Sequence, residues 1–73
     1  MAEVAVKSEI NGKVWKIEAG AGATVAEEDT ILILESMKME IPVTAPQAGA
    51  VQRIVVAEGD TVEEDQVVAY MEV

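Results

Sequence analysis

Apolar and polar residues alternate along much of this chain with the two-residue period of half-buried strands. The alternation is cleanest over residues 39–46, where the apolar positions are Met39, Ile41, Val43 and Ala45. The pattern predicts that these four side chains point inward and that the residues between them face out. Two of the outward positions are prolines, which is typical of an edge strand. No window has the length or the 3.6-residue period of a helix, so the chain is predicted to be all-β.

A second apolar run, residues 31–34, predicts another strand just before this one. Only two or three residues remain to reverse the chain, which predicts a tight hairpin with Lys38 at its tip. Two-residue hairpin turns favour Asn-Gly or Asp-Gly because both central residues need positive φ, so Met37-Lys38 fits the turn poorly. Side chains kept where glycine is preferred indicate a functional role. The alternative is a wider loop in which Lys38 is an ordinary surface amine.

The chain also repeats itself. Residues 12–35 align with residues 49–72 at a constant offset of 37, as from Gly12 to Gly49. The identical pairs are Gly12/Gly49, Val14/Val51, Ile17/Ile54, Gly22/Gly59, Thr24/Thr61, Val25/Val62, Glu27/Glu64 and Glu35/Glu72. Each half has four short strand segments separated by turns, which predicts a sandwich or flattened barrel.

The repeat predicts how the halves are arranged. The halves, about 1–37 and 38–73, are expected to pack about a pseudo-twofold axis. Shifting Lys38 by the repeat offset reaches the chain ends, so the termini should occupy one pole and Lys38 the other.

Composition narrows the functional classes. The 73 residues suggest a single domain, residues 1–73, with a thin core. Cysteine and histidine are absent, which removes disulfides, thiolate nucleophiles, the commonest general base and the usual metal ligands, so no metal site is expected. The net charge is −9, which disfavours nucleic acid as a partner. The apolar runs are too short to span a membrane and the start lacks signal-peptide features, so a cytoplasmic protein is expected.

Burial patterns give plain interpretations for several individual side chains. Trp15 has no counterpart in the second half, where Gln52 stands, and is expected to close the core on one side. Met39 is expected in the core, whereas Met37 suits either a packing gap or an adaptable contact surface. Glu35 and Glu40 flank the predicted tip, where acidic residues commonly serve solubility.

The run Glu-Ser-Met-Lys-Met-Glu at residues 35–40 resembles the biotin-attachment motif of biotin carboxyl carrier proteins. The likeness extends through Gly12, Ala45-Pro46, Gly49-Ala50-Val51 and the Gly-Asp-Thr-Val of residues 59–62. The family implies a flattened β-barrel or sandwich of two four-stranded antiparallel sheets, with biotin amide-linked to the hairpin lysine.

On this resemblance Lys38 is the covalent attachment site, and Met37, Met39, Glu35 and Glu40 are recognised by a biotin protein ligase. The family also implies a non-catalytic carrier, monomeric by itself. It would shuttle a carboxyl group between the biotin carboxylase and carboxyltransferase sites of a biotin-dependent carboxylase, such as an acyl-CoA carboxylase. As a group carrier it supplies position and not acid, base or metal.

The chain departs from the family pattern in places. Glu28-Asp29 and Asp65-Gln66 stand in turns where glycine is common, and there is no room before Thr24 for the thumb of some acetyl-CoA carboxylase carriers. Two alternatives stay open. One is a lipoyl carrier, which shares the fold but usually has Asp-Lys-Ala at its tip; the other is an unmodified structural or interaction domain.

Overall fold

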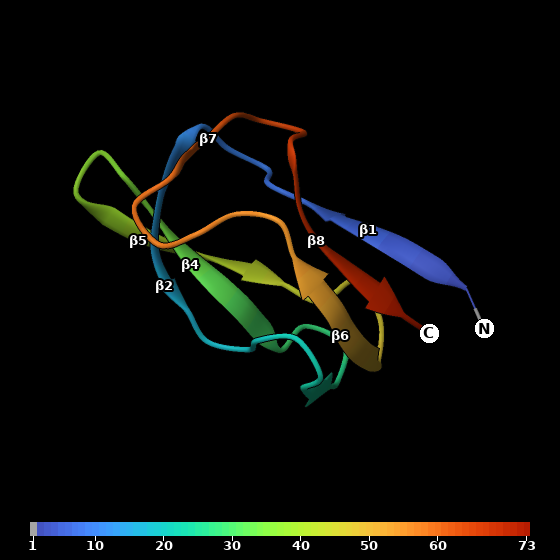
Figure 1. Cartoon of the computed structure of the whole chain (residues 1–73). Coiled ribbons are helices and arrows are strands. Elements are labelled where there is room, and N and C mark those ends of the chain that lie inside the picture. Colours follow the sequence, from blue (N-terminus) through green and yellow to red (C-terminus); the bar gives the residue numbers. More distant parts are fainter. Residues whose placement is uncertain (1) are drawn as a thin grey trace.

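The computed structural model describes residues 2–73, which form eight strands and no helix (Figure 1). The strands are β1 (Glu3–Lys7), β2 (Gly12–Ile17), β3 (Thr24–Val25), β4 (Thr30–Ser36), β5 (Met39–Thr44), β6 (Gly49–Ile54), β7 (Thr61–Val62) and β8 (Val67–Glu72). The predicted all-β class is confirmed. Residues 2–73 contain no helix that is long and apolar enough to cross a membrane.

Two four-stranded antiparallel sheets make up the molecule, in the orders β1-β8-β6-β3 and β5-β4-β2-β7. No ladder joins one sheet to the other, so the architecture is a flattened sandwich and not a closed barrel. The described chain is elongated, with extents of 36 × 17 × 17 Å. β5 is an edge strand, as Pro42 within it predicts.

The two sheets repeat one another strand for strand. Replacing each strand by the one four places along the chain converts the order β5-β4-β2-β7 into β1-β8-β6-β3. The registers agree as well, since Glu35 pairs with Glu40 in one sheet and Glu72 pairs with Glu3 in the other. Residues 37 apart are therefore equivalent in the structure, and they are called equivalent below.

The core lies between the sheets and is built mainly from aliphatic side chains. Its largest fully buried hydrophobic residues are Ile31, Leu32, Leu34, Met71, Val14, Val51, Val62 and Val68. The apolar run at residues 31–34 is thus the buried strand that the sequence predicts, with Ile33 alone turned partly outward. Ser8 is also fully buried, and its hydroxyl donates a hydrogen bond to the Ile10 carbonyl oxygen at 2.6 Å.

The expectation that Trp15 closes the core is wrong, because 47% of its surface is exposed. Trp15 is the extra residue of a β-bulge: Val14 pairs with Leu34 and Lys16 with Ile33, which leaves Trp15 without a partner on β4. A bulge interrupts the period-two alternation. Trp15 and Lys16 consequently both face solvent while Val14 faces the core.

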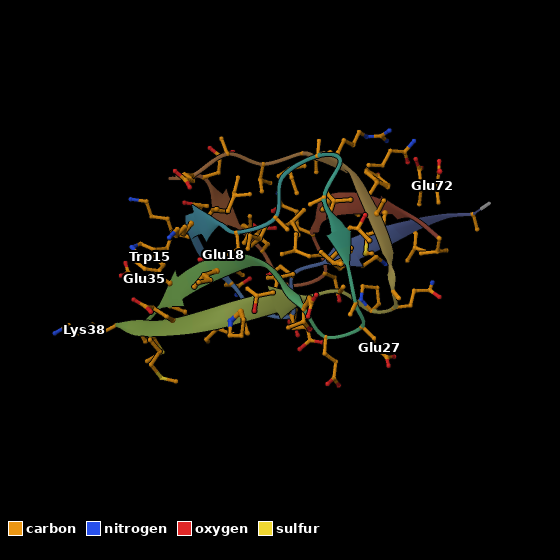
Figure 2. All side chains as sticks on the ribbon, turned by 90° about the horizontal axis from the view of Figure 1, so that it is seen from below. Trp15, Glu18, Glu27, Glu35, Lys38 and Glu72 are labelled. Atoms are coloured by element: carbon orange, nitrogen blue, oxygen red, sulfur yellow. The ribbon has the colours of Figure 1, made fainter. Side chains whose placement is uncertain are left out.

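The expectation that Met39 points into the core is also wrong, since 61% of it is exposed. Val43 and Ala45 on the same face are buried, and Ile41 is half-buried. Met39 pairs with Ser36 in the last row before the turn, where the hairpin extends past the rest of the molecule (Figure 2). The facing sheet does not reach this row, so nothing covers the side chain.

The chain ends meet at the pole opposite the β4–β5 hairpin (Figure 1). The Ala2 N–H donates to the Val73 carbonyl oxygen at 3.0 Å, and the Val73 N–H donates to the Ala2 carbonyl oxygen at 2.9 Å. These residues are the equivalents of Met39 and Ser36. The termini thus close one pole by hydrogen bonds where a covalent turn closes the other.

Candidate functional site

Met37 and Lys38 are the only two residues between β4 and β5. The flanking residues Ser36 and Met39 pair directly, and the two turn residues have φ of 52° and 65°. Positive φ at both central positions defines a type I′ turn, whose twist matches that of the flanking strands. A non-glycine residue in this left-handed backbone conformation costs roughly 1–2 kcal/mol of conformational free energy. The backbone that local rules assign to Asn-Gly is therefore occupied by a methionine and a lysine.

The Lys38 side chain points away from the body of the molecule at the end of the hairpin (Figure 2). Within residues 2–73 there are two ion pairs, Lys16–Glu18 and Arg53–Glu3, each at 3.6 Å, and neither involves Lys38. The residue is exposed. The turn therefore presents an amine that the described part of the chain does not engage.

The two methionines beside Lys38 are both open to solvent. Met37 is 92% exposed and Met39 is 61% exposed. Methionine is flexible and polarizable, so exposed thioethers provide an adaptable contact surface. The structure thus brings Met37, Lys38 and Met39 together as one accessible tip.

The two glutamates of the motif lie opposite each other across the hairpin. Glu35 pairs with Glu40, and both are exposed. Like charges directly opposite in a sheet are destabilising. The equivalent pair, Glu3 and Glu72, has the same arrangement at the other pole. The acidic pair is thus a repeated feature of the fold, whereas the two turn residues are unique to the hairpin.

A cavity beside the hairpin lies between β5 and the β1–β2 loop. Its volume is about 80 Å³, and its apolar lining comes from Ile10, Leu34, Ile41, Pro42 and Val43. A cavity of roughly 150 Å³ accommodates benzene. This cavity is too small for a fused-ring cofactor, and Lys38 is not among its lining residues.

The fold and the hairpin together define a carrier type of domain, in which a rigid β-sandwich presents one lysine at the pole opposite its chain ends. Comparison with known proteins identifies the family. The model for the biotin/lipoyl family, described as "Biotin-requiring enzyme", matches residues 3–71. The chain belongs to this family, which confirms the resemblance found in the sequence.

Small relatives match this chain along most of their length. The chain is 40% identical over 62 residues to the biotin/lipoyl attachment protein of Bacillus subtilis, covering 85% of each chain. It is 38% identical over 64 residues to the biotinylated protein TB7.3 homolog of Mycobacterium leprae, covering 88% of this chain and 90% of that one.

Larger proteins contain the same fold as one part. The structure of the Kluyveromyces lactis urea carboxylase matches with a TM-score of 0.93 and 35% identity, over 99% of this chain and 6% of that one. The chain therefore corresponds to a small portion of that protein. It is homologous to the biotin carrier domains of carboxylases.

Proposed function

We propose that this protein is a biotin carrier in which Lys38 holds biotin in amide linkage. The observation that supports this most strongly is the type I′ turn, which holds an exposed, unpaired lysine between two methionines in a backbone that favours glycine. Family membership directs the choice of group to biotin. Residues 1–73 together act as a single attachment domain.

The loading step is an acyl transfer to the Lys38 amine. After losing a proton to solvent, Nζ attacks the carbonyl carbon of a carboxyl group that a biotin protein ligase has activated with a nucleotide. The new C–N bond forms, the C–O bond to the activating group breaks, and the remaining extra proton leaves the nitrogen. Met37 and Met39 give the ligase an adaptable contact on each side of the amine, and Glu35 and Glu40 border it.

The protein's own contribution after loading is position. When bound, biotin supplies the ring that carries a carboxyl group between a biotin carboxylase and a carboxyltransferase. The rigid hairpin holds that ring away from the sandwich and raises its effective concentration at both partner sites. A monomer suits this role, because copies that each carry a charge of −9 repel one another.

Parallel expression with a biotin ligase and with a lipoyl ligase tests the proposal. Intact mass after biotin ligase should show a single biotinyl adduct, and fragmentation should place it on Lys38. A lipoyl adduct without a biotinyl one would make the protein a lipoyl carrier. An unmodified mass with both ligases would make it a structural or interaction domain, and either result overturns the proposal.

A further inference from the structure

The bulge that exposes Trp15 occurs twice in this fold. In β2, Trp15 lies between paired residues Val14 and Lys16; in β6, Gln52 lies between Val51 and Arg53, with the same shift of register against β8. The two bulges have the same backbone pairing and differ in side chain. Gln52 is therefore an internal reference for what the bulge itself requires, and the bulge does not require an aromatic residue.

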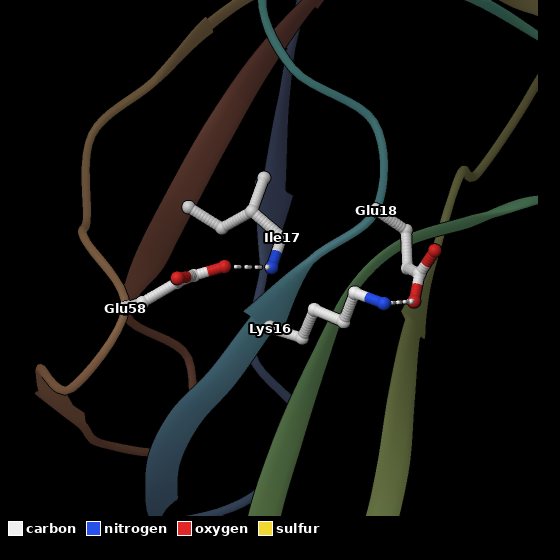
Figure 3. Close-up of polar contacts among 4 residues, drawn as sticks. All are labelled: Lys16, Ile17, Glu18 and Glu58. Atoms are coloured by element: carbon white, nitrogen blue, oxygen red, sulfur yellow. Dashed lines mark hydrogen bonds and ion pairs between the residues drawn. The ribbon is translucent and has the colours of Figure 1, made fainter.

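The loop against each bulge differs in charge. Residues 57–60 lie against β2: the Val14 N–H donates to the Asp60 carbonyl oxygen at 2.8 Å, and the Ile17 N–H donates to Glu58 Oε2 at 3.1 Å (Figure 3). The equivalent loop lies against β6 through the Val51 N–H, which donates to the Ala23 carbonyl oxygen at 2.8 Å.

The residues equivalent to Glu58 and Asp60 are Ala21 and Ala23. The loop against the tryptophan bulge thus carries two exposed acidic residues, whereas the loop against the glutamine bulge carries alanines. Glu58 accepts the Ile17 N–H, and Asp60 Oδ2 accepts the Ala57 N–H of its own turn at 2.9 Å. Neither the exposed ring nor the two acidic residues has a counterpart at the equivalent positions of the other half.

In the other sheet, β1-β8-β6-β3, a neighbouring side chain covers the ring of the aromatic residue Tyr70. The Arg53 guanidinium lies 4.2 Å from the centroid of the Tyr70 ring and pairs with Glu3 at 3.6 Å. On the hairpin sheet the residue equivalent to Arg53 is Lys16, whose amine pairs with Glu18 instead (Figure 3). Trp15 stays 47% exposed. Tyr70 is equivalent to the half-buried Ile33 and not to Trp15, so the two rings lie at different positions, and only Tyr70 has a cation over its ring.

We propose that Trp15, together with the acidic loop of Glu58 and Asp60 that packs on the same strand, is a docking site for the ligase that acylates Lys38. The partner surface is an apolar socket for the indole with lysine or arginine at its rim. Tryptophan is enriched among residues that dominate binding energy, and a charged rim governs the rate of encounter. This inference rests on the proposed function, because it names a contact made during loading.

Distance supports a ligase as the occupant. Trp15 lies beside Leu34 and Ile33, at most five residues from Lys38, which is about 17 Å at 3.3 Å per residue. An interface of roughly 800 Å² per partner corresponds to a disc of about 16 Å radius, so a partner centred on Lys38 would extend about as far as Trp15. A ligase acts on Nζ itself and so must lie against the hairpin and the adjoining rows.

Steady-state biotinylation of Trp15→Gln gives the first test. The variant places in β2 the residue that already occupies the equivalent bulge, so the fold is retained, as a thermal melt will confirm. We expect KM for the carrier to rise about tenfold or more with kcat unchanged, because the contact is the same in the ground and transition states. Gln52→Ala is the control and should leave both constants unchanged. Wild-type kinetics in Trp15→Gln would overturn the proposal.

A second readout does not depend on turnover. Trp15 is the only tryptophan, so 5-fluorotryptophan labels one site. Unlabelled ligase added to labelled Lys38→Arg protein should shift or broaden its ¹⁹F signal, whereas biotin carboxylase should not. A response to the carboxylase alone would assign Trp15 to a later step and overturn the proposal.

Glu58→Ala introduces the residue of the equivalent loop and should weaken the salt dependence of KM for the ligase. An unchanged salt dependence would remove Glu58 from the docking site. If wild-type protein gains no biotin at all, the proposed function fails; if it is loaded normally and the Trp15 variant is too, only the docking site fails.

Discussion

Met37 and Lys38 adopt a backbone that most side chains avoid. Their φ angles are 52° and 65°, and Asn-Gly forms the same turn without comparable strain. The strain persists because the flanking ladder from Thr30 to Ser36 fixes the two residues that enter and leave the turn. What the chain gains is a lysine at a fixed position with its amine in solvent.

Exchanging the two turn residues tests whether that position matters. The double variant Met37→Lys, Lys38→Met keeps the composition, but the amine leaves a different backbone position with a different direction. About 1 Å of misplacement can cost roughly a hundredfold in rate, so we expect biotin loading to fall by about that factor. Loading rates measured by mass spectrometry check this. Wild-type rates, with the adduct on the relocated lysine, would show that the ligase accepts any flexible lysine at the tip.

Sequence patterns predict the tight hairpin with Lys38 at its tip, but they misplace two nearby residues. Trp15 is exposed because a bulge breaks the alternation on which its inward placement depends. Met39 continues the inward face of β5 into a row that the opposite sheet does not cover. Alternation predicts which side a residue faces, and cannot predict where the ladder shifts or where the facing layer ends.

The two acidic turns share an unusual backbone position. Glu28 has φ of 71°, and its equivalent Asp65 has φ of 68°. The turns are closed by side chains, since Asp29 Oδ2 accepts the Ala26 N–H and Gln66 Oε1 accepts the Glu63 N–H, both at 2.9 Å. These φ values explain why glycine is common here in the family, and why this chain departs from it at a cost in strain.

Glu28→Gly should therefore stabilise the protein. It removes the left-handed strain of a glutamate, offset in part by the greater entropy of glycine in the unfolded chain, for a net gain of about 0.5 kcal/mol. The control is Glu27→Gly in the same turn, which removes the same charge at a residue without positive φ and should destabilise by about 0.5–1 kcal/mol. Chemical denaturation of both variants measures the difference. Equal effects would mean that strain at Glu28 is negligible.

The repeat governs the molecule as a whole. An offset of 37 in the sequence becomes an offset of four strands that relates one sheet to the other, and it puts the hydrogen-bonded ends, Ala2 and Val73, opposite the hairpin. Internal similarity therefore predicts the strand pairing and the poles. It does not separate a sandwich from a closed barrel, which depends on β3 and β7. Each has two residues and pairs with one neighbour only, so neither bridges the sheets.

The net charge of −9 should act on association with partners. Exposed charges farther apart than the Debye length, about 10 Å at 0.1 M salt, are largely screened. The ligase surface proposed above has lysine or arginine at its rim and would be attracted to this acidic chain. Its association rate should therefore fall as salt increases, while the dissociation rate changes less. Stopped-flow measurements at low and high salt check this. Association rates that stay constant would remove electrostatic steering from the account.

We propose that one amine, Lys38 Nζ, carries the prosthetic group, and that the fold does not depend on the Lys38 side chain for its stability. Lys38→Arg tests it most directly, because arginine keeps the charge at an exposed turn but cannot form the amide. We expect the variant to match the wild-type free energy of unfolding within about 0.5 kcal/mol. After expression with biotin ligase, we expect an unmodified intact mass and no streptavidin binding. A biotinylated Lys38→Arg protein would place the attachment site elsewhere and contradict the account.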